Sequence, residues 1–159
     1  MNKKNLIDGF TSLIERELSA IEAAARATLE AATHPESKAE NKYDTRGLEA
    51  SYLAGAQAKR VSEMQEVLGL FRTLAFKDLD PDDPVQSTAL VEVNLDGKKN
   101  ILLLMPKGGG VQITHDGENV QIVTPASSLG EALLGLHVNE HAEFEVGNKI
   151  RRCEILKVQ

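Results

Sequence analysis

The sequence predicts an α+β chain, in which an antiparallel helical hairpin precedes a small antiparallel sheet with one short helix. Residues 1–76 contain two long stretches whose apolar residues recur every seven positions, which is typical of paired helices. Residues 87–159 change to short apolar runs bounded by Gly, Asp and Asn turn signals, which is typical of strands. Residues 77–86 form an acidic linker with two prolines. We therefore expect a hairpin domain, a linker and a globular domain with these bounds.

The hairpin is predicted from two apolar seams of similar length. In the first helix, expected over residues 5–33, Ile7, Ile14 and Ile21 repeat at seven-residue spacing. In the second, expected over residues 38–74, two such frames run side by side: Leu53, Val67 and Leu74, and Ala50, Gln57, Met64 and Phe71. Pro35 cannot readily continue the first helix, so the chain is expected to turn back there and pair the two seams.

Three carboxylates cluster near the predicted hairpin tip. Ser37 and Glu40 have the spacing of a capping box, which would begin the second helix. Glu36, Glu40 and Asp44 follow one another at intervals of four, so a helix would place them on roughly one face. The predicted tip therefore brings three carboxylates within two helical turns.

The globular domain is predicted from alternating runs and turn residues. Strands are expected over residues 89–95, 100–105, 111–114, 120–124, 143–146 and 150–158, with a hairpin turn at Asp96-Gly97. A short helix over residues 129–134 is expected to be capped by Ser127 or Ser128 and stopped by Gly135. Cys153, the only cysteine, is expected to lie buried in the last strand.

Composition excludes several classes of function. The net charge is −6, and most of it comes from residues 77–159, which carry 8 basic and 13 acidic side chains, so direct DNA or RNA binding is disfavoured. No apolar run is long enough for a bilayer, and we expect a cytoplasmic protein without membrane contact. The four histidines have no ligand spacing and no nucleophilic triad is apparent, so no bound cofactor and no catalysis by the chain alone are expected.

Several strings resemble the Gre transcript-cleavage factors of bacterial RNA polymerase. Residues 127–135, SSLGEALLG, are similar to the family string S-P-x-[GA]-R-A-L-L-G and are followed by Val138-Asn-Glu and a last strand over 153–158. Near the tip, Glu40-Asn41 and Tyr43 resemble the family's D-x-x-E-N-A-E-Y, and Arg60-Val61 resembles its return helix. The resemblance covers nearly the whole chain and implies an FKBP-like fold for the globular domain.

The resemblance also implies a partner and a mechanism. A Gre-like chain would bind RNA polymerase at the secondary channel as a monomer and would meet RNA only at the 3′ end inside that complex. Tip carboxylates, here Glu40 with Glu36 or Asp44, would assist the polymerase's own RNA cleavage, and Glu40 and Glu36 would share a Mg²⁺ ion with it. The globular domain would contact polymerase through the string at 127–135: Ser127, Ser128, Leu129, Glu131, Leu133 and Leu134.

The sequence departs from the family pattern at informative positions. Aligning Glu40-Asn41 with the family's E-N puts Ser37 at the metal-holding Asp, whereas aligning Arg60-Val61 puts Glu40 there and Tyr43 at the Glu position. In the C-terminal string, Ser128 replaces Pro and Glu131 replaces Arg. Two alternatives therefore stay open: a channel-binding regulator that does not stimulate cleavage, and a hairpin interaction module unrelated to polymerase.

Overall fold

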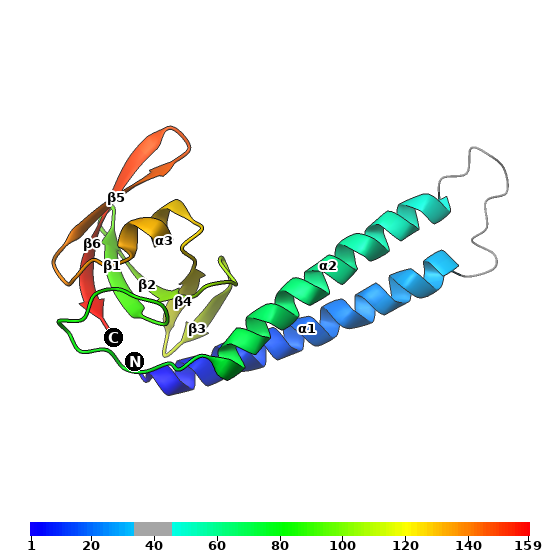
Figure 1. Cartoon of the computed structure of the whole chain (residues 1–159), viewed down its shortest axis with the longest axis horizontal. Coiled ribbons are helices and arrows are strands. Elements are labelled where there is room, and N and C mark those ends of the chain that lie inside the picture. Colours follow the sequence, from blue (N-terminus) through cyan, green and yellow to red (C-terminus); the bar gives the residue numbers. More distant parts are fainter. Residues whose placement is uncertain (34–45) are drawn as a thin grey trace. The chain divides into compact units, whose positions relative to one another are not determined.

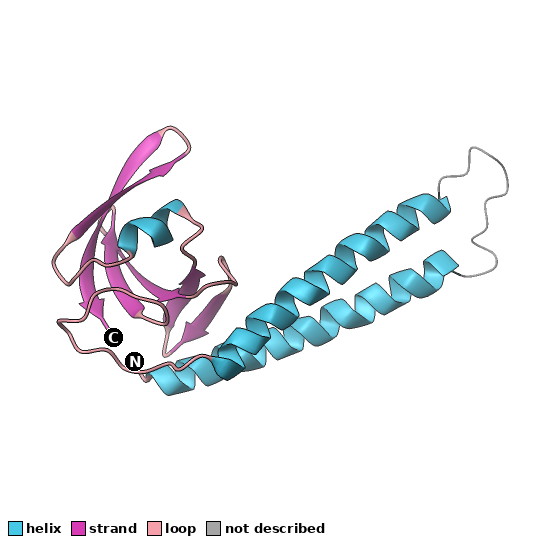
Figure 2. Cartoon of the chain, in the orientation of Figure 1, coloured by secondary structure: helices cyan, strands magenta, loops and turns pink. Residues whose placement is uncertain are grey.

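The structure, a computed structural model, describes residues 1–33 and 46–159. In these residues it contains three helices and six strands (Figures 1 and 2). The chain divides into two compact units. One, here called the globular unit, combines residues 1–10 with 70–159, and the other, the hairpin unit, comprises residues 11–69. The first helix therefore contributes its opening turns to the globular unit, whereas the predicted boundaries, which stay a prediction, assign it to the hairpin alone.

The hairpin unit is made of two long helices that pack most tightly where α1 begins and α2 ends. Helix α1 spans Lys3–Thr33 and α2 spans Arg46–Thr73. At a rise of about 1.5 Å per residue, each is on the order of 45 Å long. Ile14 and Leu18 of α1 and Val67 and Leu68 of α2 are buried, as the seven-residue pattern predicts for Ile14 and Val67. Gln65 Nε2 donates a hydrogen bond to Glu22 Oε1 at 3.0 Å, which fixes the register of the two helices.

The seam loosens beyond this hydrogen bond. In Figure 1 the ribbons of α1 and α2 separate toward the end of α1 and the start of α2. The seven-residue pattern places Leu53 in the seam, but this side chain is 54% exposed, as is Leu29. Gln57, a polar residue at another seam position, has a buried Oε1 with no hydrogen-bond partner. The apolar repeat alone therefore overestimates how far the two helices pack together.

The globular unit is built on one six-stranded sheet. Its strand order is β3-β4-β2-β1-β6-β5. The strands are β1 (Leu90–Leu95), β2 (Lys98–Leu104), β3 (Gln112–His115), β4 (Glu118–Val123), β5 (His141–Val146) and β6 (Lys149–Val158), and helix α3 (Ser128–Leu133) connects β4 to β5. The predicted α+β architecture, with one short helix beside the sheet, is confirmed.

One pairing differs from the expected antiparallel sheet. Strands β2 and β4 run parallel, with Ile101 opposite Val120 and Leu104 opposite Val123. The intervening β3 pairs only with β4, so the chain reverses once more before β4 joins the sheet. The predicted turn at Asp96-Gly97 is confirmed: both residues have positive φ, 50° and 81°, as a two-residue type I′ turn requires.

Successive side chains of a strand point to opposite faces of the sheet, and both faces of this sheet carry buried apolar side chains. One face forms a core with α3, in which the fully or nearly fully buried side chains come from every strand except β3. This core contains Val85, Ala89, Val91, Val93, Leu102, Leu104, Val123, Leu133, Ala142, Phe144, Cys153, Ile155 and Val158. Cys153 lies there as predicted, and burial raises the pKa of its thiol.

The opposite face is covered by the start of α1. Leu103 and Ile122 are fully buried but do not belong to the α3 core, so they need another cover. Leu6 and Phe10 are also fully buried, and a Cβ added at Gly9 would lie 3.0 Å from Ile113 Cδ1 of β3. The sheet is therefore sandwiched between two helical layers, one of which comes from the opposite end of the sequence.

A chain of aromatic rings continues this second layer. The Phe10 and Phe71 centroids are 5.6 Å apart, and those of Phe71 and Phe76 are 5.5 Å apart. Both separations lie in the favourable range for aromatic pairs. The end of α2 and the following residues are thereby attached to the first turns of α1.

Lys3 ties three distant parts of the sequence together. Its side chain is only 3% exposed, and its Nζ donates to the main-chain oxygens of Lys77 at 2.6 Å and Gln159 at 2.9 Å. Burial lowers the pKa of Lys3, and the negative charge of Asp78 partly opposes this effect. A single ammonium group thus connects the start of α1, the linker and the last residue of the globular unit.

Replacement of Lys3 by Met should lower the free energy of unfolding by about 1–2 kcal/mol at pH 7, because Lys77 O and Gln159 O each lose the Lys3 hydrogen bond, although Gln159 O still accepts from Leu90 N. The pH dependence has a defined sign. Because the folded pKa of Lys3 is lowered, the unfolded chain binds more protons between that value and the ordinary lysine pKa of 10.5. Lys3 therefore makes the free energy of unfolding rise with pH across this window.

Urea denaturation of the wild type and Lys3→Met from about pH 7 to the ordinary lysine pKa of 10.5 would test this, with Lys4→Met as the control because Lys4 is exposed. The stability difference between wild type and Lys3→Met should grow with pH. A constant difference, or the same behaviour in Lys4→Met, would contradict the burial of this amine.

Candidate functional site

The predicted tip carboxylates lie outside the described residues. This applies to Glu36, Glu40 and Asp44, and to Ser37, which one alignment places at the metal-holding position. Within residues 1–33 and 46–159, no group of three or more His, Cys, Asp or Glu side chains is arranged to hold a metal ion. The described residues also contain no helix that is long and apolar enough to cross a membrane.

The C-terminal string, in contrast, is fully described and begins with a helix cap. Gly130 N donates to Ser127 Oγ at 3.1 Å, and Ser127 Oγ donates to Thr124 O at 2.8 Å. Ser127 has extended backbone angles, φ −94° and ψ 147°, as expected for an N-cap residue. Of the two serines that the sequence offers, Ser127 is therefore the cap, and Ser128 is the first residue of α3.

The two glycines of the string have separate structural roles. A Cβ at Gly130 would lie 2.1 Å from Thr124 O and 2.6 Å from Thr124 C, so only glycine lets α3 approach the preceding loop this closely. Gly135 has φ +79° and follows the end of α3, where a left-handed residue is favoured. Its N–H donates to Val85 O at 2.8 Å, and Val85 N donates back to Leu136 O. The string thus holds the linker against α3.

The six residues predicted to contact a partner divide into two groups. Ser127, Ser128, Glu131 and Leu134 are exposed, and Leu129 is half-buried. Leu133 is completely buried in the α3 core, so it stabilises the fold and does not reach the surface. The available contact surface of α3 is therefore the exposed side around Ser128, Glu131 and Leu134.

A shallow cavity lies beside the start of α3. It measures about 400 Å³ and is lined mainly by main chain and small side chains: Gly109, Gly110, Gln121, Ile122, Val123, Thr124, Ala126, Ser127 and Leu129. Gly109 and Gly110, which lie between β2 and β3, supply one wall of it. The described residues bring no charged side chain into its lining.

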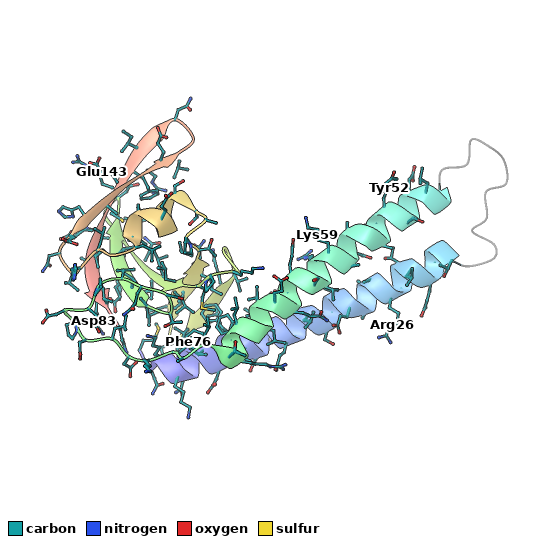
Figure 3. All side chains as sticks on the ribbon, viewed as in Figure 1. Arg26, Tyr52, Lys59, Phe76, Asp83 and Glu143 are labelled. Atoms are coloured by element: carbon teal, nitrogen blue, oxygen red, sulfur yellow. The ribbon has the colours of Figure 1, made fainter. Side chains whose placement is uncertain are left out.

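Several ion pairs join side chains of the strands and their turns. Lys99 Nζ lies 3.1 Å from Glu92 and 3.4 Å from Glu118, and hydrogen bonds to these two carboxylates raise the pKa of Lys99. Arg151 contacts Asp96 at 2.6 Å, and Arg152 pairs with Glu143, which projects from β5 in Figure 3. These pairs are exposed, so each contributes little to stability.

Comparisons with known proteins give likenesses in fold only. No family model matches the chain, and no curated protein matches it. Gfh1 of Thermus aquaticus is 12% identical over 93% of this chain and 92% of that chain, with a TM-score of 0.38. GreA factor homolog 1 (Gfh1) of Thermus thermophilus is 15% identical over 94% of both chains, with a TM-score of 0.37.

A third solved structure, the transcription elongation factor GreA/GreB from Nitrosomonas europaea, is 18% identical over 70% of this chain and 91% of that chain, with a TM-score of 0.36. At such identities and TM-scores the likenesses do not extend to function, which has to be proposed from this chain's own residues.

Sequence reasoning missed two features of the globular unit. In the sequence, Lys3 looks like any exposed basic residue at the start of an amphipathic helix. The two main-chain oxygens that accept its hydrogen bonds lie more than 70 residues away, so neighbouring residues give no indication of them. The requirement for glycine at position 130 could have been suspected, because glycine in a short helix is unfavourable unless something approaches it closely.

Proposed function

We propose that this protein binds RNA polymerase at its secondary channel in the bacterial cytoplasm and modulates transcription elongation. The observation that carries this proposal is the string at 127–135, which is similar to that of Gre factors and whose Ser127, Gly130 and Gly135 each have a structural role here. The paired helices α1 and α2 supply the finger that such a protein requires.

The proposed action divides between the two units. The exposed side of α3, with Ser128, Glu131 and Leu134, would contact the polymerase rim. A single copy of the hairpin would enter the channel, and only there would the chain meet the RNA 3′ end. Mg²⁺ shared with the polymerase would activate water for RNA cleavage. Glu40 and Glu36 are the proposed residues for that ion, with Asp44 as a further tip carboxylate.

A second candidate is a regulator that binds in the channel without stimulating cleavage. Ser37 favours it, because one alignment puts this uncharged residue where the family has a metal-holding Asp. Glu131, which stands at the position of the family's Arg and is exposed, would also change the sign of the polymerase contact. This candidate shares the binding step with the first and differs only in the fate of the RNA.

Replacing Glu40 by Ala should decrease cleavage of backtracked RNA by about 10²-fold, as is typical for loss of one group that stabilises developing charge. The measurement uses a stalled, backtracked complex with Mg²⁺ and 3′-labelled RNA. Glu63→Ala is the matched control, because Glu63 is an exposed carboxylate on the shaft of α2 and should leave cleavage unchanged.

The outcomes separate the candidates. Release of short 3′ fragments by wild type and Glu63→Ala, but not by Glu40→Ala, supports a cleavage factor. Intact RNA with demonstrable binding to the complex supports the non-cleaving regulator. Absence of binding would refute both and would leave the hairpin as an interaction module for another protein.

A further inference from the structure

In each long helix of the hairpin, a row of buried or half-buried side chains marks the seam where α1 and α2 pair. The row in α1 consists of Ile14, Leu18, Ile21, Ala25 and Thr28, and the row in α2 consists of Leu68, Met64, Val61, Gln57 and Ala54. The residues of both rows are spaced alternately three and four positions apart, which is the spacing of a coiled-coil seam. The seam therefore continues into the distal half of the hairpin, here residues 19–33 of α1 and 46–66 of α2.

The side chains that form the seam change in character along its length. The hydrogen bond between Glu22 and Gln65 fixes which residues of the two antiparallel helices are level with each other. Counted from that bond to within about two residues, or roughly 3 Å, the successive layers are Leu18 with Leu68, Ala25 with Val61, and Thr28 with Gln57. The layers therefore pass from large to smaller apolar side chains and then to polar ones.

The polar layer leaves a hydrogen-bond acceptor unpaired. Gln57 Oε1 is buried and has no hydrogen-bond partner among the described residues. Thr28, the seam residue level with it, donates its hydroxyl proton to Ala24 O of its own helix at 3.0 Å. That proton is the only one the hydroxyl has, so Thr28 does not donate to Gln57. Because a buried acceptor without a donor costs free energy, this layer weakens the pairing of the two helices.

The side chains beside the distal seam add little to this pairing. Leu29 and Leu53 are each 54% exposed, and a groove of about 560 Å³, lined mainly by small side chains, lies between the two helices. Gly55 lines this groove, and a Cβ added there would meet no described atom within 4 Å, so this glycine lowers helix stability without permitting a close approach. Among the described side chains of the distal half none is buried, in contrast to Ile14 and Val67 nearer the globular unit.

We propose that the distal half of the hairpin is a conformational switch, which opens and closes as one unit while the rest of the chain stays folded. In the closed form α1 and α2 pair along the whole seam. In the open form the two helices separate beyond the hydrogen bond between Glu22 and Gln65. Gln57 sets the balance between the two forms, because opening returns its buried amide oxygen to water.

The switch changes the width of the distal half without requiring any change in the globular unit. Opening exposes the half-buried apolar seam residues Ile21, Val61 and Met64 to solvent, and closing covers them again. A partner that recognises only the closed form binds with an affinity reduced by the fraction of chains in that form. The switch is therefore a means of regulating binding, whichever partner the hairpin has.

Native-state amide hydrogen exchange of the full chain tests the switch, because each amide reports the free energy of the opening that exposes it. Amides of residues 19–33 and 46–66 should have protection factors at least about tenfold below those of residues 14–18 and 67–71. The values on the two distal segments should be similar, since both helices lose their partner in the same opening.

Two substitutions in α2 should shift the balance in opposite directions. Gln57→Leu should raise the protection factors of the distal half about tenfold or more, because it replaces a buried unpaired acceptor with an apolar side chain of similar size. Val61→Thr should lower them, because it puts a hydroxyl into an apolar layer of the seam. Both changes should appear on the distal part of α1 as well as on α2. A merely local effect on α2 would leave the amides of α1 unchanged.

Ala56→Leu is the matched control for Gln57→Leu, because Ala56 is the exposed neighbour of Gln57 in α2. Alanine and leucine are both strong helix formers, so the protection factors of this variant should stay within about threefold of the wild type. Equal protection of the two halves in the wild type, no gain in Gln57→Leu, or a gain confined to α2 would overturn the proposal. All of these measurements use the chain alone, so none of them depends on binding to polymerase.

Discussion

Substitution of Gly130 by Ala is expected to destabilise the globular unit by about 3 kcal/mol or more, which is above the usual cost of one extra methyl group in a packed interior. The added Cβ would lie 2.1 Å from Thr124 O and 3.0 Å from Val123 Cγ1. Since the nearest obstacle is main chain, no side-chain rotation can relieve the contact. Helix α3 would have to move away from the loop, which would also weaken the cap formed by Ser127.

Equilibrium urea unfolding measures this effect, with Gly69→Ala as the matched control. Gly69 lies inside α2, and an added Cβ would have no neighbour within 4 Å. This control should be neutral or more stable by up to about 1 kcal/mol, because alanine is the better helix former. The same Gly→Ala change should therefore lower the free energy of unfolding at position 130 and leave it unchanged or raise it at position 69. A Gly130→Ala protein as stable as the wild type would show that α3 does not approach Thr124 so closely.

Substitution of Phe10 by Ala is expected to cost about 3–5 kcal/mol of the free energy of unfolding, as is typical for a buried aromatic ring. Phe10 is fully buried, and its ring centroid lies 5.6 Å from that of Phe71. Its loss opens a cavity in the helical layer that covers the Leu103 and Ile122 face of the sheet. The first turns of α1 would then lose their largest fully buried side chain.

Phe76→Ala is the matched control for Phe10, because Phe76 is only half-buried but also stacks on Phe71 at 5.5 Å. It should cost clearly less, since part of its surface stays in water in the folded protein. Urea unfolding followed by far-UV circular dichroism gives both values. Equal costs for Phe10 and Phe76 would mean that the opening turns of α1 do not belong to the core of the globular unit.

Local signals were sufficient for most secondary structure. The Asp96-Gly97 turn and the alternation on either side of it predicted β1 and β2, because the positive φ values needed there suit these residue types. Ser127 and Gly135 marked the two ends of α3 for similar reasons. The same reasoning could have placed a turn at Asp116-Gly117, where φ is 53° and 79°.

Features that depend on distant residues could not be predicted in this way. Alternation shows which residues share a face but not the direction of a neighbour, so the parallel pairing of β2 with β4 was missed. A seven-residue repeat likewise cannot tell where two helices separate, and Leu53 is exposed despite its frame. The candidate tip residues Glu36, Glu40 and Asp44 remain predictions, and of the predicted contact residues Leu133 proved to be core.

The composition of the globular unit, residues 1–10 with 70–159, constrains how the protein folds during synthesis. Leu6 and Phe10 are synthesised before the hairpin unit, residues 11–69, whereas the sheet face that they cover is synthesised after it. Strand β6, which pairs with β1 near the middle of the sheet, follows the other five strands in the sequence. Burial of Leu6 and Phe10 therefore depends on contacts with residues far away in the sequence, which are slow to form during folding.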